Sequence, residues 1–218
     1  MMNQPLLLQS PNQAIDLTNF LSRAKKMDED GVVRFRAFGD VLAVSVAPIF
    51  TSSLFADGPT AIGMRTMKLA SPTEVDSVVL LGEVLQRLPK AEESLQLELP
   101  IDHKPASWTG ISAPRNGWEA VVEYTDEQVS EWAKKGIKDV AESLPDTVGG
   151  PVAARIRAQI WSRPVDIGLM LPGAAAFAMA GLGFLVKGEN VKAYKNKNWL
   201  RLSTSYGHVI TRESTRLS

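Results

Sequence analysis

The side chains that most often perform catalysis or bind metals are scarce in this sequence of 218 residues. It contains no cysteine and only two histidines, His103 and His208. Without cysteine the chain cannot form disulfides, thiolate nucleophiles or cysteine-based zinc sites. No H-x-x-x-H or H-E-x-x-H motif exists, so we also predict no histidine-rich metal site.

Other catalytic motifs are absent or misplaced. The sequence contains neither a G-x-S-x-G nucleophile elbow nor a Walker A motif. Asp102 and His103 could form an acid–base pair, but adjacent residues in an extended loop point apart. The Gly181-Leu182-Gly183 segment lies at the end of an expected helix, whereas a phosphate binds at a helix N-terminus. We therefore predict no catalytic residues, no metal site and no cofactor, and a protein that is not an enzyme.

The formal net charge is zero, yet charge is distributed unevenly along the chain. Residues 151–218 contain ten Lys/Arg and three Asp/Glu, a net charge of +7, which leaves −7 on residues 1–150. Such asymmetry can indicate a half that binds nucleic acid or anions, or two halves that neutralise each other across an internal interface. The candidate nucleic-acid or anion-binding residues are Arg155, Arg157, Lys192, Lys195, Lys197 and Arg201.

Three segments have the composition of a helix N-terminus in which a hydroxyl and a Glu or Gln side chain cap backbone amides. Ser10-Pro11-Asn12-Gln13 predicts a helix to about Met27, and Thr125-Asp126-Glu127-Gln128 predicts a charged amphipathic helix that Pro145 stops. Ser71-Pro72-Thr73-Glu74 is ambiguous, because β-branched residues follow it. There we favour a strand over VDSVVLL and then a short helix over GEVLQRLPKAEE.

The first half of the chain also contains the alternating apolar and polar residues that are typical of antiparallel strands. VVRFRAF (32–38) and VLAVSVAPI (41–49) flank Gly39-Asp40, which predicts a hairpin. TAIGMRTMKL (60–69) and LQLELP (95–100) are two further predicted strands. Residues 1–107 are therefore expected to form an antiparallel sheet with flanking helices.

Residues 108–218 are expected to form a second part, after a connection in which Trp108 and Trp118 favour burial. PVAARIRAQIW (151–161) predicts a helix that Arg163-Pro164 ends. Its buried face is expected to contain Val152, Ile156 and Ile160, with Arg155 and Arg157 turned outward. ENVKAYKNKNWLRLSTSYGHVITR (189–212) predicts two or three short strands.

The most apolar segment is IGLMLPGAAAFAMAGLGFLV (167–186), about as long as a membrane-spanning helix of roughly 20 residues. Pro172-Gly173 divides it, and a helix from about Pro172 to Leu185 would be roughly 20 Å long, too short for a hydrocarbon core of roughly 30 Å. We therefore predict a buried helix and no membrane association. The first 16 residues have no basic region, so we expect no secretory signal and a cytoplasmic location.

Three segments resemble a family of uncharacterised proteins from actinobacteria: WTGISAPRNGWE (108–119), ARIRAQIWSRP (154–164) and WLRLSTSYGHVITR (199–212). Together with VVRFRAFGDVLAV and TAIGMR, the resemblance covers nearly the whole chain. It implies a bacterial cytoplasmic setting and a chain of two parts. It implies no activity, cofactor or catalytic residue.

These patterns together predict an α+β protein, with an antiparallel-sheet domain over 1–107 and a helical subdomain with a basic C-terminal β-hairpin over 108–218. Three helices followed by a hairpin is a winged-helix-like order. The helix that would enter the major groove, near 172–185, has no Lys, Arg, Asn or Gln to contact bases or phosphates. We therefore expect a non-catalytic binding or scaffolding protein that acts through contacts with a protein partner. The alternative is a nucleic-acid-associated protein that uses the basic residues.

Overall fold

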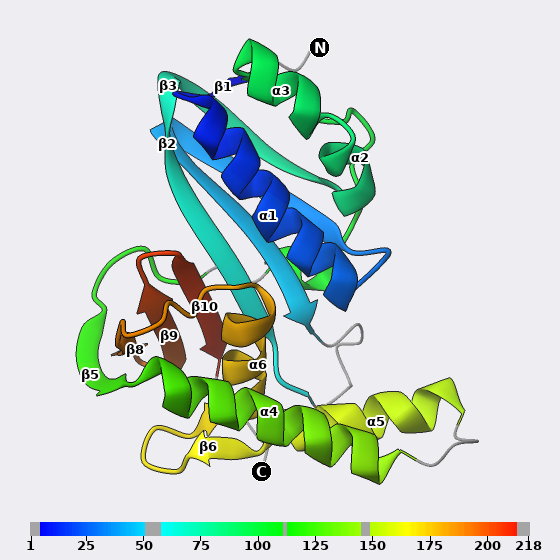
Figure 1. Cartoon of the computed structure of the whole chain (residues 1–218), viewed down its shortest axis with the longest axis vertical. Helices are drawn as coiled ribbons and strands as arrows, with labels where there is room; N and C mark the ends of the chain where they lie inside the picture. Colours follow the sequence, from blue (N-terminus) through cyan, green and yellow to red (C-terminus); the bar gives the residue numbers. More distant parts are fainter. Residues whose placement is uncertain (1–4, 51–57, 111–112, 145–148, 213–218) are drawn as a thin grey trace. The chain divides into compact units, whose positions relative to one another are not determined.

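A computed structural model of the chain describes residues 5–50, 58–110, 113–144 and 149–212 (Figure 1). The chain divides into two compact units, residues 1–48 with 64–110 and residues 49–63 with 111–218. Both units contain helices and antiparallel strands, and the α+β class predicted from the sequence is confirmed. The second unit takes in a short segment from the first half of the chain, which the sequence pattern does not indicate.

The first unit is built on two long strands, β2 (Val32–Ile49) and β3 (Ala61–Leu80), with helix α1 (Pro11–Met27) lying across them (Figure 1). The buried face of α1 includes Leu17 and Leu21, which lie four positions apart on one side of the helix. Strands β1 and β4 pair antiparallel. The shorter elements are β1 (Leu6–Leu7), α2 (Leu81–Leu85), α3 (Leu88–Ser94), β4 (Gln96–Leu97) and a 3-10 turn, η1 (Ser107–Gly110).

The hairpin predicted at Gly39-Asp40 is wrong, because β2 is one continuous strand of 18 residues. Val33 and Phe35 are buried before the glycine, whereas Leu42 and Val44 are buried after it. The buried face thus changes from odd to even positions. Gly39 has a φ of +66°, the left-handed conformation that a glycine supplies in a β-bulge. Gly39 therefore forms no turn, and the set of residues that face the core shifts by one position after it.

The three predicted helix starts have different outcomes. Thr125 caps a helix as predicted, because its hydroxyl accepts a hydrogen bond from the Gln128 amide at 3.1 Å. Ser10 is an N-cap residue without a side-chain cap bond, and the side-chain oxygen Oε1 of Gln13 accepts from the Gln9 backbone amide at 2.7 Å instead. Ser71 lies inside β3 and starts no helix, since long-range strand pairing outweighs the local capping signal.

The remaining predictions for the first half are partly confirmed. A strand followed by short helices is found at the end of β3, as favoured above. The prediction of a six-residue strand over 95–100 is wrong, because only Gln96 and Leu97 form a strand, which pairs with β1. Leu95 has a φ of +58° and interrupts the extended backbone before them. Trp108 is 3% exposed and buried as expected, whereas Trp118 is half-buried.

The second unit combines an antiparallel sheet with three helices. Strands β10, β9 and β8 form a meander, and β5 extends it beside β8. Within this unit the hydrogen-bonded order is β10-β9-β8-β5. The predicted C-terminal hairpin is therefore part of a larger sheet. The elements are β5 (Glu119–Tyr124), α4 (Asp126–Ser143), α5 (Gly150–Ser162), β6 (Pro164–Asp166), β7 (Leu171–Pro172), α6 (Gly173–Gly181), β8 (Val191–Asn196), β9 (Trp199–Thr204) and β10 (Gly207–Arg212).

Helix α6 is the buried helix predicted within the apolar segment. It ends at Gly181 rather than near Leu185, because Gly183 adopts a φ of +75° and the chain turns there. Alanines occupy five of its nine positions, and four of them, Ala174, Ala175, Ala176 and Ala178, are fully buried. Small side chains let α4 and α5 pack close to it. In the described part of the chain, no helix is long and apolar enough to cross a membrane.

Helix α5 ends before Pro164 as predicted, but its buried face differs from the prediction. Ala153, Ile160 and Trp161 are buried, whereas Val152 is 52% exposed. The first turn of α5 is open to solvent, so an apolar residue there has no partner to cover it. Arg155 and Arg157 point outward as predicted. The stop expected at Pro145 lies outside the described residues.

A test of this packing is the substitution of Gly207, which begins β10. A β-carbon there would lie 2.7 Å from Cε1 and 2.8 Å from Cζ of the fully buried Phe184 ring. We expect Gly207→Ala to lower the free energy of unfolding by about 1–3 kcal/mol through overpacking. Urea denaturation followed by tryptophan fluorescence measures this change, and the matched control is Gly150→Ala, whose β-carbon meets open space. Equal midpoints for the two variants would contradict the packing described.

Candidate functional site

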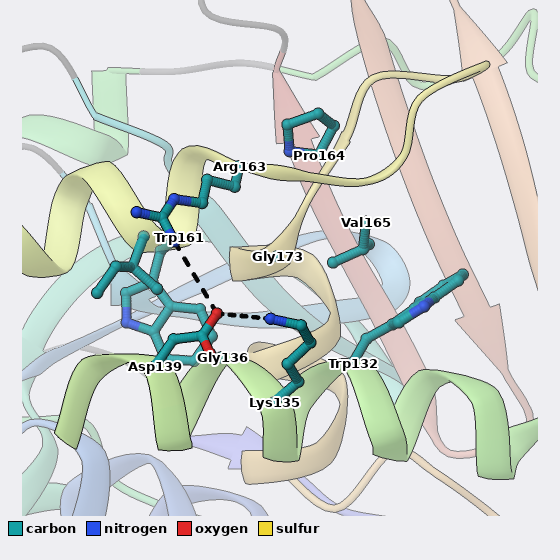
Figure 2. Close-up of a pocket in the computed structure, with 10 residues that line it drawn as sticks. Trp132, Lys135, Gly136, Asp139, Trp161, Arg163, Pro164, Val165 and Gly173 are labelled. Atoms are coloured by element: carbon teal, nitrogen blue, oxygen red, sulfur yellow. Dashed lines mark hydrogen bonds and ion pairs between the residues drawn. The ribbon is translucent and has the colours of Figure 1, made fainter. Parts of the chain in front are cut away.

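A cavity of about 360 Å³ opens in the second unit between α4, α5, β6 and the start of α6 (Figure 2). Its walls are mainly apolar and its rim is charged. Ligand pockets in proteins start at about this size, roughly 300 Å³. The lining residues are Trp132, Lys135, Gly136, Asp139, Ile160, Trp161, Arg163, Pro164, Val165 and Gly173.

Helix α4 supplies one wall of the pocket through residues that share a helical face. Lys135, Gly136 and Asp139 come three, four and seven positions after Trp132, so all four residues lie on one side of the helix. The cap at Thr125 fixes where α4 begins. The Trp132 ring is held edge-on against Tyr124, with ring centroids 4.9 Å apart.

The pocket floor depends on the close approach of α4 and α5 at Gly136. A β-carbon on Gly136 would lie 2.3 Å from Cζ3 of Trp161, so only glycine fits there. Trp161 in turn packs against Phe177 of α6, with ring centroids 4.4 Å apart. The indole of Trp161 therefore joins all three helices, and one of its faces borders the pocket.

The charged rim consists of one carboxylate and two cations. Asp139 Oδ2 accepts a hydrogen bond from Lys135 Nζ at 2.9 Å and lies 4.0 Å from Arg163 Nη1 (Figure 2). Both cationic side chains are mostly exposed, at 74% for Lys135 and 66% for Arg163. The rim thus has a surplus of one positive charge beside an apolar floor.

The outer wall is the β6–β7 hairpin, which a partly buried hydrogen bond holds in place. Tyr124 Oη donates to Asp166 Oδ2 at 2.6 Å, and Asp166 Oδ1 accepts from the Leu169 amide at 3.0 Å. The hydrogen bond from Tyr124 is the main cause that lowers the pKa of Asp166. Burial, with help from that bond, raises the pKa of Tyr124. This contact ties the hairpin to β5 and so positions Val165 at the pocket.

The structure distributes the six predicted basic residues over several places. Arg155 and Arg157 lie exposed on α5, and Lys197 lies in the β8–β9 turn. On the sheet, Lys192 of β8 pairs with Ser203 of β9, and Tyr194 pairs with Arg201. Residues two positions apart on a strand share a face, so Lys192 and Arg201 lie on the same face. Lys195 lies opposite Leu200 and belongs to the other face. The six residues therefore form no single patch.

The two histidines are separate and occupy different units. His103 Nδ1 lies 3.4 Å from the Ser77 hydroxyl in the first unit. His208 Nδ1 lies 2.9 Å from the Ser203 hydroxyl on the sheet of the second. Burial, and then the charge of Arg201, lower the pKa of His208. Among the described residues, no group of three or more His, Cys, Asp or Glu side chains is arranged to hold a metal ion.

The pocket residues were not among those predicted from the sequence. The spacing of Trp132, Lys135 and Asp139 on the amphipathic helix is a signal that could have indicated them. Gly136 inside that helix is a second signal, since a glycine in a helix interior costs about 1 kcal/mol and then has a packing reason.

Comparison with protein families adds no biochemical role. Residues 1–108 match a model described as a domain of unknown function (DUF8010), and residues 113–216 match a second domain of unknown function (DUF8185). No curated protein matches the chain. The two matched segments are separated by residues 109–112, so Trp108 ends the first and Trp118 lies near the start of the second.

The hydrogen bond between Tyr124 and Asp166 gives a pH-dependent prediction. Tyr124→Phe should raise the pKa of Asp166 towards its ordinary value, and should lower stability at neutral pH by about 1–2 kcal/mol. Because the folded-state pKa of Asp166 is depressed, its contribution is present at neutral pH and is lost as pH falls through that pKa. The difference between the variant and the wild type should therefore shrink below about pH 4.

The measurement is a carbon-13 NMR titration of the Asp166 carboxyl, combined with urea denaturation at neutral pH and again below about pH 4. Tyr194→Phe is the matched control, because the Tyr194 hydroxyl forms no hydrogen bond within the described residues. An unchanged Asp166 titration in Tyr124→Phe would show that the bond is not made in solution.

Proposed function

We propose that the protein is a non-catalytic binding or scaffolding protein, and that its second unit docks a protein partner at the pocket between α4, α5 and β6. The observation that carries the proposal is the combination of an apolar floor with a cationic rim in one cavity. The partner segment would place a large apolar side chain in the cavity and a carboxylate at the rim.

The size and lining of the cavity support an apolar anchor. A volume of about 360 Å³ suits one large side chain of the partner, together with part of the residue next to it in the partner's sequence. The indoles of Trp132 and Trp161 and the side chain of Val165 offer flat and aliphatic surfaces for it. Aromatic anchors that fill such pockets supply most of the affinity in many protein interfaces.

The charge of the rim supports an acidic neighbour to that anchor. Asp139 is shared by Lys135 and Arg163, which leaves donors on both cations for a second carboxylate. Arg163 can bind a carboxylate through two parallel hydrogen bonds. A basic partner would meet two cations and one already engaged carboxylate.

The surface beside the pocket also suits a protein contact. The β6–β7 hairpin, whose first strand lines the pocket, carries Ile167 and Met170 near its tip. These side chains are 79% and 54% exposed. Exposed apolar residues next to a cavity are typical of a surface that a partner covers.

A nucleic-acid-associated role remains the alternative. The order of α4, α5 and α6 before the C-terminal strands supports a winged-helix-like interpretation, and Arg155 and Arg157 are exposed on α5. The burial of α6 and the scattering of the basic residues weigh against it, since a groove-reading helix must be accessible. Saturable binding to duplex DNA that weakens steeply with salt would favour this alternative.

The setting that we propose for the protein is the cytoplasm of an actinobacterium. The resemblance of residues 108–119 and 199–212 to actinobacterial proteins supports the source. The lack of cysteine in the whole chain is compatible with a reducing compartment.

The test is a selection of random displayed peptides on the immobilised full-length protein. We expect enriched peptides to carry a large apolar residue within one or two positions of Asp or Glu. Two variants probe the site: Val165→Phe fills the cavity, and Lys135→Glu reverses the charge of the rim. Each should weaken binding of the enriched peptides by about tenfold or more, the loss expected from one anchor or one charged contact.

The matched control is Lys138→Glu. Lys135 and Lys138 are both exposed lysines of α4, each paired with an acidic residue four positions later. Only Lys135 lines the pocket. No enrichment, or enriched peptides that bind all three variants as tightly as the wild type, would overturn the proposal.

A further inference from the structure

Arg201 of β9 is held between two aromatic rings on the sheet of the second unit. Its guanidinium carbon lies 4.7 Å from the centroid of the Trp118 ring and 4.4 Å from that of the Tyr194 ring. Tyr194 is the residue opposite Arg201 on β8, so the sheet register fixes one side of this arrangement. We call these three residues the arginine clamp.

The chain anchors the second ring as well. Trp118 Nε1 donates a hydrogen bond to the Pro114 carbonyl at 3.0 Å. Two residues before Trp118, the Asn116 backbone carbonyl accepts a hydrogen bond from Asn196 Nδ2 at 2.8 Å. Asn196 belongs to β8, the same strand as Tyr194. The loop and the strand therefore hold both rings in place around the cation.

The polar edge of Arg201 lacks the partners that a buried arginine normally has. Nε is fully shielded from solvent and has no hydrogen-bond acceptor. Among the described residues, no carboxylate forms an ion pair with this guanidinium. Burial of a polar donor without an acceptor costs free energy, about 1–3 kcal/mol and more for a charged group. Such orphaned groups often mark the place of a ligand or ion.

The surrounding face of the sheet is suited to a negative ligand. Lys192, Ser203 and His208 lie on the same face as Arg201, by their positions in the strand register. The acidic residue on this face, Glu123 of β5, is already engaged by Lys192 at 4.0 Å and by Asn190 Nδ2 at 3.0 Å. The hydroxyl of Ser203 and the ring of His208 are 2.9 Å apart and offer further polar contacts.

We propose that the arginine clamp is a binding site for an oxyanion, a carboxylate or a phosphate group, which meets the two terminal Nη groups of the guanidinium, since Arg201 is only partly buried and Nε is the donor that is sealed from solvent. The two rings lie within about 5 Å of the guanidinium carbon, and the donors of a guanidinium lie in its own plane. A planar fork of this kind matches two oxygens of a carboxylate or phosphate. The arginine clamp shares no residue with the pocket between α4 and α5. An experiment can therefore refute one of the two proposed sites and leave the other standing.

The test is a titration of the full-length protein followed by nitrogen-15 NMR at the Arg201 Nε–H and Trp118 indole N–H signals. Inorganic phosphate is the probe in one arm, acetate in the second, and sodium chloride at matched ionic strength is the reference. We expect saturable shifts of both signals with at least one oxyanion, and the stronger arm identifies the preferred class. Chloride, which cannot bind through two oxygens, should leave both signals without saturation.

Two variants separate a ligand site from a purely structural clamp. Arg201→Lys keeps the charge but loses the fork, so the affinity measured at the Trp118 signal should fall by about tenfold. Arg157→Lys changes an exposed arginine of α5 in the same way and should have no effect. Equal shifts with chloride, no saturation in either arm, or unchanged affinity in Arg201→Lys would overturn the proposal. If Arg201→Lys fails to fold, the two oxyanion arms on the wild type decide the question alone.

Discussion

The second unit depends on how closely three helices can approach each other around the indole of Trp161. Gly136 of α4 has no side chain where that indole lies, and a single methyl group there would fall within 2.3 Å of the ring. Phe177 of α6 packs on the same indole. The alanines of α6 extend this close packing, since they fill the space between the helices and the sheet without pushing them apart. A larger residue at any of these contacts would separate α4 from α5.

The same packing produces the pocket and sets its chemistry. Close contact at Gly136 brings α4 next to the C-terminal end of α5, where Arg163 and Pro164 turn the chain into β6. The charged residues of α4 then meet Arg163 at the rim, while the indoles remain at the floor. The Tyr124–Asp166 hydrogen bond closes the remaining side by holding the β6–β7 hairpin. A binding role therefore follows from helix packing rather than from a catalytic motif.

Local signals in the sequence predicted local features well. The hydroxyl of Thr125 caps α4, and Pro164 ends α5, because each acts within one helical turn. Features that depend on distant partners could not be predicted in this way. Gly39 indicates a turn, but β2 continues through it as one strand, and its left-handed φ coincides with a change of the buried face. The pocket escaped prediction because its residues come from four elements, and no single segment contains the pattern.

The most direct test of the account is whether the pocket binds a small molecule that has an aromatic ring and a carboxylate. Phenylacetate can be titrated into the full-length protein while NMR follows the five tryptophan indole N–H signals. The account predicts saturable shifts at Trp132 and Trp161, and loss of these shifts in Val165→Phe. Saturable shifts confined to the other tryptophans, or none at Trp132 and Trp161, would contradict it.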